Sequence, residues 1–211
     1  MPTVSFAVTV CNEHEELVRL IDQLVSISSP EDEIVIQADS DKVSKEVHNI
    51  ATKYQERAPN LIRYIQFPLN KDFATYKNNI KRECKKDYIF FIDADEYLSD
   101  ELATYLKAIL DLNEGVDCYC VPRINVVEGL TQQHLLKWRW SLDEDNHINY
   151  PDYQTRICKN KSEIVWSGKV HEILQGWLIR SYIPFETKEF VLIHHKTIEK
   201  QERQNKLYET I

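Results

Sequence analysis

The first half of the chain alternates apolar, β-branched segments with segments of helical periodicity, and this alternation limits the possible folds more than any other feature. The strand-like segments are residues 3–10, 32–39, 61–67 and 87–94. Between them, and again at 99–112, apolar residues recur every three or four positions, which indicates amphipathic helices. Strands that are apolar on both sides and alternate with helices predict a parallel sheet covered on both faces. We therefore expect an α/β fold with a mostly parallel central sheet.

The second half of the chain lacks this regular alternation. Its strand-like segments are residues 116–129, 153–160, 163–174 and 189–196. Residues 130–150 are polar and irregular, which predicts a long loop. These patterns indicate a smaller mixed or antiparallel part beside the parallel half. Residues 198–211 carry a sparse apolar stripe, which predicts a polar C-terminal helix that leads into a further domain.

Charge and targeting signals exclude some classes of partner. The formal net charge is −8 and the isoelectric point is about 5.4, which argues against a nucleic-acid partner held by its phosphates. No apolar run approaches the ~20 residues of a membrane span, and the N-terminus lacks the features of a signal peptide. The five cysteines are scattered and odd in number, which favours reduced thiols and a cytoplasmic protein.

An apolar run from Tyr88 to Ile92 leads directly into three acidic residues, Asp93, Asp95 and Glu96. On an extended chain, residues two apart face the same side, so Asp93 and Asp95 are expected to point together. Two close carboxylates repel each other unless a cation lies between them. Hard oxygen ligands favour Mg²⁺ or Mn²⁺. The alternative is a solvated turn, or charges at the start of the next helix.

Other polar residues follow the ends of the predicted parallel strands. Thr9 and Glu13 lie at the end of the first strand, and Asp39 ends the second. Ligands of such sheets bind at the carboxyl ends of the strands. We therefore expect these residues to share one site with Asp93 and Asp95.

Four segments together resemble family 2 glycosyltransferases of the GT-A fold. The resemblance is closest to small bacterial and viral members with a VHE segment, and it extends to the N-terminal glycosyltransferase domain of a chlorella virus protein. The segments are VSFAVTVCNEHEE, IVIQADSD, KNNIKRECKKDYIFFIDADEYLSDEL and YPDYQTRICKNKSEIVWSGKVHEIL. The resemblance implies one GT-A domain over residues 1–211. Within it, residues 1–115 bind the nucleotide-sugar and residues 116–197 bind the acceptor. It also implies that the anomeric centre is inverted.

The resemblance assigns roles to residues of the donor site. The residues that should contact the nucleotide-sugar are Thr9, Val10, Asn12, Glu13, Asp39, Lys77, Asn78 and Ala94. Asp39 matches the acid that contacts the base, usually uracil. Lys77 matches a basic residue that can contact phosphate, and the alternative for it is a solvated helix face.

The same resemblance makes Asp93 and Asp95 the D-x-D motif that holds Mn²⁺ or Mg²⁺, with Asp95 as the preferred direct ligand. His194 is a candidate third ligand, because some enzymes of this fold supply a histidine from late in the chain. The alternative for His194 is a structural role.

The acceptor hydroxyl must lose its proton as it attacks the anomeric carbon, and this requires a general base. Asp152 is the first candidate, because it resembles the family acid that precedes an arginine, here Arg156. Glu172 in the VHE segment is the second. For each, the alternative is an ordinary exposed acid.

The expected function is therefore metal-dependent transfer of a sugar from a UDP-sugar, such as UDP-glucose or a UDP-rhamnose-like donor, to a glycan, glycoprotein or glycolipid. We expect it in the cytoplasm, at the cytosolic face of a membrane, or in the cytoplasm of a host cell if a virus encodes it. A sugar-nucleotide nucleotidyltransferase would need a glycine-rich basic loop after the first strand, which is absent here. A non-catalytic nucleotide- or glycan-binding module remains the alternative of another class.

Overall fold

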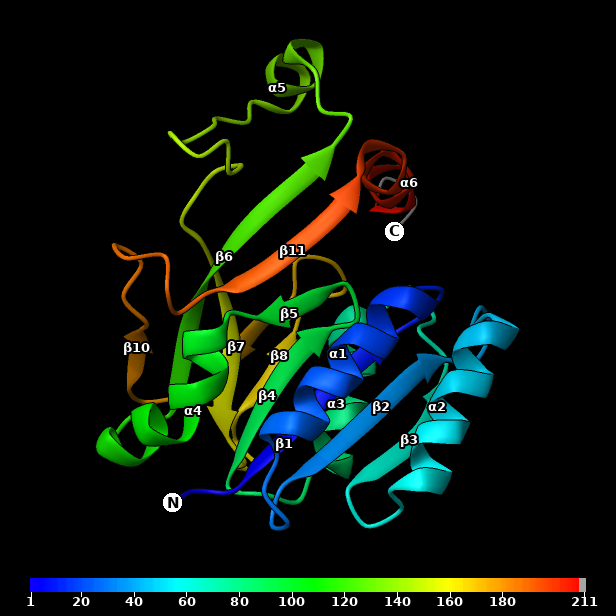
Figure 1. Cartoon of the computed structure of the whole chain (residues 1–211), viewed down its shortest axis with the longest axis vertical. Helices are drawn as coiled ribbons and strands as arrows, with labels where there is room; N and C mark the ends of the chain where they lie inside the picture. Colours follow the sequence, from blue (N-terminus) through cyan, green and yellow to red (C-terminus); the bar gives the residue numbers. More distant parts are fainter. Residues whose placement is uncertain (209–211) are drawn as a thin grey trace.

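The computed structural model describes residues 1–208, and a single mixed β-sheet runs through it (Figure 1). Its parallel part contains β1 (Val4–Val10), β2 (Glu33–Asp39), β3 (Ile62–Phe67) and β4 (Tyr88–Asp93) in the spatial order β3-β2-β1-β4. In β1, β2 and β4 nearly every residue is buried, as strands covered on both faces require. The predicted parallel sheet is therefore confirmed.

Helices cover both faces of this parallel sheet. The covering helices are α1 (His14–Ile27), α2 (Lys45–Arg57), α3 (Phe73–Glu83) and α4 (Asp100–Leu112). The first face, with Phe6 and Val8, packs against α1, α2 and α4, whereas the second, with Ala7, packs against α3. Figure 1 shows α1 and α2 side by side across the first face.

Side-chain caps fix where three of these helices begin. The hydroxyl of Ser44 accepts a hydrogen bond from the backbone N–H three residues later, at the start of α2. Asp72 does the same for α3 and Ser99 for α4. Such caps satisfy N–H groups that the first helical turn leaves unpaired.

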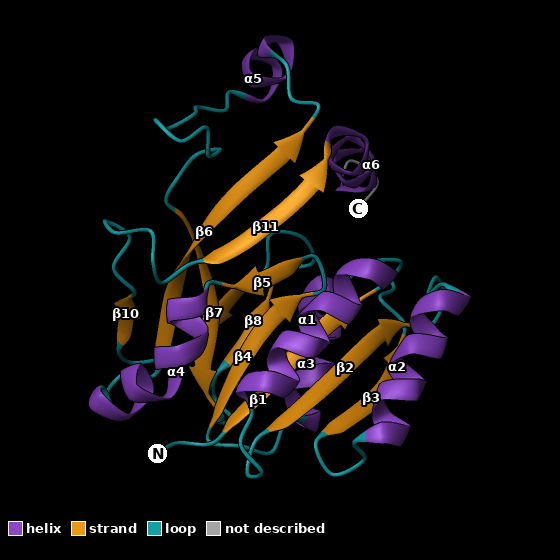
Figure 2. Cartoon of the chain, viewed as in Figure 1, coloured by secondary structure: helices purple, strands orange, loops and turns teal. Residues whose placement is uncertain are grey.

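The second half of the chain extends the sheet with mixed pairing (Figure 2). Its strands in this sheet are β6 (Cys118–Glu128), β7 (Asp152–Lys159), β10 (Arg180–Tyr182) and β11 (Leu192–Thr197), and β5 (Glu96–Leu98) of the first half joins them. β7 is antiparallel to both β4 and β6, and β11 is parallel to β6. β5 pairs with β11, and β10 pairs with β6. The predicted mixed part is confirmed, and it continues the parallel sheet through the β4–β7 pair.

A separate two-stranded ribbon covers the second face of the sheet beside α3. It consists of β8 (Val165–Ser167) and β9 (Ile173–Gln175), which pair antiparallel. The Trp166 ring meets the Phe91 ring edge-on, with 5.2 Å between the centroids. The ribbon therefore joins the core through the buried side chains of Trp166 and Leu174.

Several elements differ from the sequence-based expectation, and the predicted strand 163–174 is broken by a turn into β8 and β9. The predicted loop 130–150 contains α5 (Gln132–Trp138), which is capped by reciprocal bonds between Thr131 and His134. Because α5 buries none of its residues, it has no apolar stripe that a periodicity argument can detect. β5 and β10 were also not expected, because three residues are too few to display alternation.

The C-terminal helix is present as α6 (Ile198–Tyr208). The last three residues of the predicted helix, 209–211, lie outside the described residues. Within residues 1–208, no helix has the length and apolar character that a membrane span requires.

Candidate active site

A cavity of about 1100 Å³ opens where β1, β2 and β4 end, and residues of β6, β7, β11 and α6 complete its walls. It brings together residues from both halves of the chain. The predicted residues from the first half that line it are Thr9, Val10, Asn12, Glu13, Asp39, Lys77, Asp93, Ala94 and Asp95. Those from the second half are Asp152, Glu172 and His194.

Asn78 is the predicted site residue that the structure does not bring to the cavity. Its side-chain amide donates to the carbonyl of Trp166 and accepts from the N–H of the same residue, at 2.8 and 2.9 Å. Asn78 therefore binds β8 to α3, whereas its neighbour Lys77 lines the cavity together with Phe73 and Tyr76 of the same helix.

Asp93 ends β4 and is held on both carboxylate oxygens. The Thr9 hydroxyl donates to Oδ1 at 2.8 Å, and the Arg156 guanidinium donates to Oδ2 at 2.7 Å. Burial raises the pKa of Asp93, but the charges of Arg156 and Lys77 outweigh it and hold this pKa well below its usual range. Asp93 is therefore an ionised, fixed carboxylate at the cavity floor.

Asp95 does not lie on an extended strand, as the spacing argument assumed. The strand ends at Asp93, and Ala94 and Asp95 form a turn before β5. Asp95 Oδ2 lies 3.2 Å from Nε2 of His194. Burial raises the pKa of Asp95, but the hydrogen bond and charge of His194 outweigh this effect and keep it well below its usual range.

The partners of His194 make this pair suitable for a divalent cation. Asn125 donates its amide N–H to Asp152, so its oxygen is free to accept from Nδ1–H of His194 at 2.9 Å. Nε2 of His194 then faces the Asp95 carboxylate, where it can donate to Oδ2 or share a metal ion with it. Two neighbouring ligands ~2.1 Å from a metal lie about 3 Å apart, which fits the observed separation.

A second acidic group lies away from the cavity. Among residues 1–208, Asp143, Asp145 and His147 are the three metal-type ligands whose atoms all lie within 4.8 Å of one another. The ammonium of Lys188 already contacts both aspartates. The group is therefore explained as an ion-pair cluster that binds the loop after α5 to the segment before β11.

A buried network of charges connects the donor and acceptor sides of the cavity. Glu96 of β5 is fully buried and pairs with the guanidinium groups of Arg123 on β6 and Arg156 on β7. Arg156 also forms an ion pair with Asp93, and Arg123 forms one with Asp152. Sequence reasoning did not identify Arg123 or Glu96 as site residues, although an arginine within the apolar strand CYCVPRINVV was a usable signal.

Asp152, the first candidate base, lies at the start of β7 and is oriented by several donors. Arg123 donates to Oδ2 through Nε and a terminal nitrogen, at 3.0 and 2.7 Å, and Asn125 donates at 2.8 Å. Gln154 donates to Oδ1 at 2.8 Å. Burial raises the pKa of Asp152, but the charge of Arg123 outweighs it and lowers this pKa overall.

Glu172, the second candidate base, forms an ion pair with Lys77. The Lys77 ammonium also lies 4.6 Å from the centre of the Trp166 ring. Both side chains are largely buried. The pair therefore forms the wall between α3 and the β8–β9 ribbon.

The rim near β1 and β2 contains polar groups that are already ordered. Glu13 Oε2 accepts from the N–H groups of Cys11 and Asn12, both at 2.9 Å. Asp39 Oδ1 accepts from the N–H of Leu69 at 3.1 Å. The loops after β1 and β3 are thus fixed before any ligand enters.

β11 and α6 add cations that sequence reasoning missed. Lys196 lies at the end of β11, and burial lowers its pKa to about 8, with a further contribution from the charge of Arg123. Lys200 of α6 lies 3.1 Å from Asp95 Oδ2. A lysine within a polar helix carries no sequence signal of such a contact, because it resembles a solvated face.

The comparisons with known proteins agree with the fold. The model of glycosyl transferase family 2 matches residues 5–168, which is most of the chain. No curated protein sequence matches it.

Several solved structures share the fold. Residues 1–349 of S. aureus TarS in complex with UDP superpose with a TM-score of 0.64 at 16% identity, covering 97% of this chain and 64% of that one. The complex of the same fragment with UDP-GlcNAc gives 0.64 at 15%, covering 93% and 59%. GalNAc-T7 with UDP, GalNAc and Mn²⁺ gives 0.50 at 14%, covering 59% and 24%. The chain thus spans about 60% of the TarS fragment, and at these identities the likeness shows the fold, which is the predicted GT-A architecture.

Proposed function

The chain belongs to glycosyl transferase family 2, and we propose that it transfers a sugar from a UDP-sugar to a hydroxyl group of a glycan, with a divalent cation. The observation that carries this proposal is the contact between Asp95 Oδ2 and His194 Nε2 at the carboxyl ends of β1 and β4. Two ligand atoms in contact at the ligand-binding edge of such a sheet are what a cation between protein and diphosphate needs.

The donor occupies the side of the cavity lined by β1, β2 and β4. Asp39 and the backbone of residues 9–12 contact the nucleoside, and Lys77 lies where it can reach a phosphate. The solved TarS complexes, which contain UDP and UDP-GlcNAc, support UDP as the nucleotide. UDP-glucose and UDP-rhamnose-like donors are the sugars to test first.

Asp95 and His194 would hold Mn²⁺ or Mg²⁺, with Asp93 beside them and fixed by Thr9 and Arg156. When bound, the cation neutralises the charge that develops on the leaving diphosphate. Asp93 and Glu96 give the neighbouring guanidinium groups fixed positions, so the charges around the leaving group need little rearrangement.

Asp152 acts as the general base in this proposal. Its carboxylate takes the proton of the acceptor hydroxyl while that oxygen bonds to the anomeric carbon. The bond from this carbon to the diphosphate breaks on the opposite side, and its electron pair leaves with the diphosphate, which inverts the configuration. Arg123 and Asn125 orient the carboxylate, and Glu172 is the alternative base.

The acceptor enters from the side of the cavity formed by the loop after β6. Trp140, Ile148 and Asn149 line this part of the cavity, and an aromatic ring beside an amide suits the apolar and polar faces of a sugar. A glycan, free or linked to protein or lipid, is therefore the proposed acceptor. We place the reaction in the cytoplasm, because the five cysteines are free thiols that suit a reducing compartment.

Calorimetric titration of UDP tests the proposal, with GDP as control and with and without Mn²⁺. We expect Mn²⁺-dependent UDP binding that Asp95→Asn weakens by about 10–100-fold or more. Asp111→Asn, an exposed aspartate on α4, is the matched control and should bind as the native chain does. If neither nucleotide binds with or without metal, the glycosyltransferase proposal is wrong.

Donor hydrolysis and transfer assays then separate the two candidate bases. Asp152→Asn should retain UDP binding and lose turnover, whereas Glu172→Gln should keep turnover within about tenfold of native. The opposite pattern would transfer the role of base to Glu172. Nucleotide binding without hydrolysis or transfer of any UDP-sugar would favour a non-catalytic binding module.

A further inference from the structure

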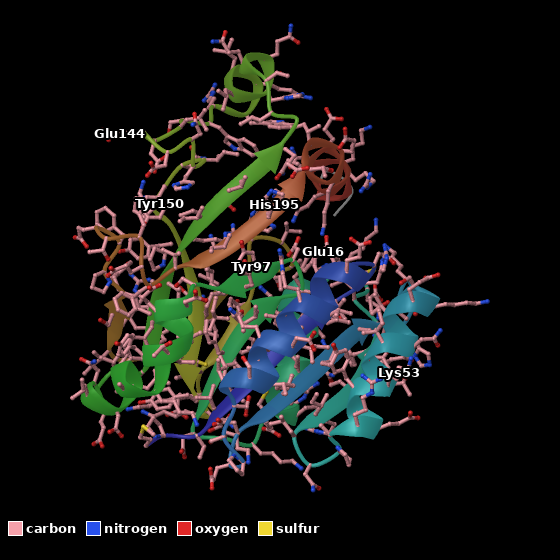
Figure 3. The ribbon with its side chains drawn as sticks, in the orientation of Figure 1. Glu16, Lys53, Tyr97, Glu144, Tyr150 and His195 are labelled. Carbon is pink, nitrogen blue, oxygen red and sulfur yellow. The ribbon has the colours of Figure 1, made fainter. Side chains whose placement is uncertain are left out.

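Lys200 of α6 occupies a position for which the family pattern provides no role. The family match ends at residue 168, and α6 follows β11 directly. The Lys200 ammonium lies 3.1 Å from Asp95 Oδ2, 3.4 Å from Glu13 Oε1 and 3.8 Å from Glu16 Oε1. Figure 3 labels Glu16 at the end of α1 that faces α6.

The contact with Asp95 uses the same oxygen atom that faces His194. Asp95 Oδ2 is 3.2 Å from Nε2 of His194 and 3.1 Å from the Lys200 ammonium. A divalent cation on this oxygen would lie close to the ammonium and repel it. The Asp95 side chain is only 15% exposed and that of Lys200 24%, so solvent screens this repulsion incompletely.

Lys200 therefore has to leave Asp95 when a divalent cation binds, and the cavity determines where it can go. Lys196 and Arg203 line the same wall, and Glu13 and Glu16 already lie near the ammonium, so an anion that enters with the metal would compete with these two carboxylates for it. A lysine side chain is a flexible point charge with three donors, which suits phosphate oxygens. The diphosphate of the proposed donor supplies that anion.

We propose that Lys200 is the internal counterion of Asp95 in the donor-free protein and that it exchanges this carboxylate for the donor's diphosphate when the divalent cation binds. The inference rests on the proposed function and adds to it a diphosphate-binding residue from the C-terminal helix. It requires a change in the side chain of Lys200 only, and α6 can stay where it is.

The exchange predicts two effects of opposite sign for Lys200→Met. Mn²⁺ alone should bind about 5–10-fold more tightly than to the native chain, because the competing ammonium is gone. UDP in the presence of saturating Mn²⁺ should bind about tenfold more weakly, because a diphosphate contact is lost. Lys200→Arg should shift both affinities less than Lys200→Met does, because it keeps the positive charge.

Two further variants separate this exchange from a general effect of charge. Lys206→Met removes the same charge from the same helix, at an exposed residue that does not line the cavity, and should leave both affinities within about twofold. In the Asp95→Asn background, Lys200→Met should no longer tighten Mn²⁺ binding. Far-ultraviolet circular dichroism of each variant checks that α6 and the rest of the fold are retained.

Calorimetric titrations of Mn²⁺ and of UDP decide the matter. Tighter Mn²⁺ binding together with weaker UDP binding in Lys200→Met supports the exchange. If the native chain binds UDP with Mn²⁺ but Lys200→Met leaves either affinity unchanged, or shifts both in the same direction, the exchange is wrong and the proposed function stands. If the native chain binds no nucleotide, both are overturned.

Discussion

At the scale of single residues, Glu96 is a fully buried acid that lies behind the cavity wall. Its side chain is inaccessible to solvent, yet it carries a carboxylate that accepts from Arg123, from Arg156 and from the backbone N–H of Asp93. A buried charge is tolerable only when partners of this kind surround it. Glu96 thereby sets the position of two guanidinium groups that reach Asp93 and Asp152.

Replacing Glu96 with glutamine should destabilise the protein by about 3–5 kcal/mol, because two buried guanidinium groups lose their shared counter-charge. Urea unfolding followed by circular dichroism measures this change. Glu56→Gln, at an exposed residue of α2, should change stability by less than about 0.5 kcal/mol. Equal stabilities of native chain and Glu96→Gln would contradict the assigned role of the network.

Asp117 should contribute to the dependence of stability on pH. Lys161 donates to its Oδ1 at 2.8 Å and the Leu178 N–H donates to Oδ2 at 2.9 Å, and these bonds lower its pKa to about 2. The unfolded value is about 3.9, so the folded state binds its proton less readily. The stabilisation is therefore complete above pH ~4 and is lost as pH falls toward 2.

Urea unfolding at several values between pH 5 and pH 2.5 tests this expectation. The difference in unfolding free energy between native chain and Asp117→Asn should shrink as the pH falls. For Asp111→Asn, an exposed residue, it should stay nearly constant. A constant difference for Asp117→Asn as well would show that its carboxylate is not titrating as proposed.

Sequence reasoning reached the residues whose position follows from strand order. The ends of β1, β2 and β4 had to meet at one edge, so the order of the strands along the chain was enough to place Thr9, Asp39, Asp93 and Asp95 together. The contacts of Arg123, Lys196 and Lys200 depend on how β6, β11 and α6 pack in three dimensions. No local pattern encodes that packing.

At the scale of secondary-structure elements, the β8–β9 ribbon requires glycine at position 176. Gly176 follows β9 with a φ of +86°, and a Cβ atom there would stand 1.8 Å from the carbonyl oxygen of Glu163. Only glycine adopts this φ without cost and leaves room for that oxygen. The ribbon carries Trp166, and the turn between its strands carries Glu172.

Gly176→Ala should therefore destabilise the protein, by about 1–3 kcal/mol from the backbone conformation alone and by more from the clash. Thermal unfolding and urea unfolding both measure this loss. Gly115→Ala is the matched control, because nothing lies within 4 Å of a Cβ at that position. A Gly176→Ala variant as stable as Gly115→Ala would mean that the ribbon adapts freely.

The elements that sequence reasoning missed share a physical cause. β5 and β10 each contain three residues, and α5 buries none of its side chains. Periodicity reports burial on one face, and it needs enough residues to repeat. The buried strands and amphipathic helices of the first half satisfied both conditions, and there the sequence was sufficient.

At the scale of the whole molecule, the two halves of the chain share one sheet. β4 of the first half pairs with β7 of the second, and Glu96 and Arg156 link the same halves through buried charge. If either half unfolded separately, the edge of β4 or β7 and a buried charge would be exposed to solvent. We therefore expect a single cooperative transition.

The positions of the tryptophans and of the helices allow this single transition to be tested. All four tryptophans lie in the second half of the chain, whereas the three longest of the described helices, α1, α2 and α4, lie in the first. Urea curves recorded by tryptophan fluorescence and by circular dichroism at 222 nm should have the same midpoint. Two separate midpoints would mean that the halves unfold independently.

The alternation of side chains along β6 has a consequence for how enzymes of this kind diversify. Every second residue of β6 lines the cavity, namely Arg123, Asn125 and Val127. The first two contact Asp152, and Val127 packs beside the tryptophans of the loop after β6. Insertion of one residue within β6 would turn every later side chain to the opposite face of the sheet. The length of this strand is therefore constrained. The loop beyond it carries no such restriction. For the proposed glycosyltransferase, rewriting residues 129–149 is therefore the change that should alter acceptor preference while Arg123 and Asn125 stay in register.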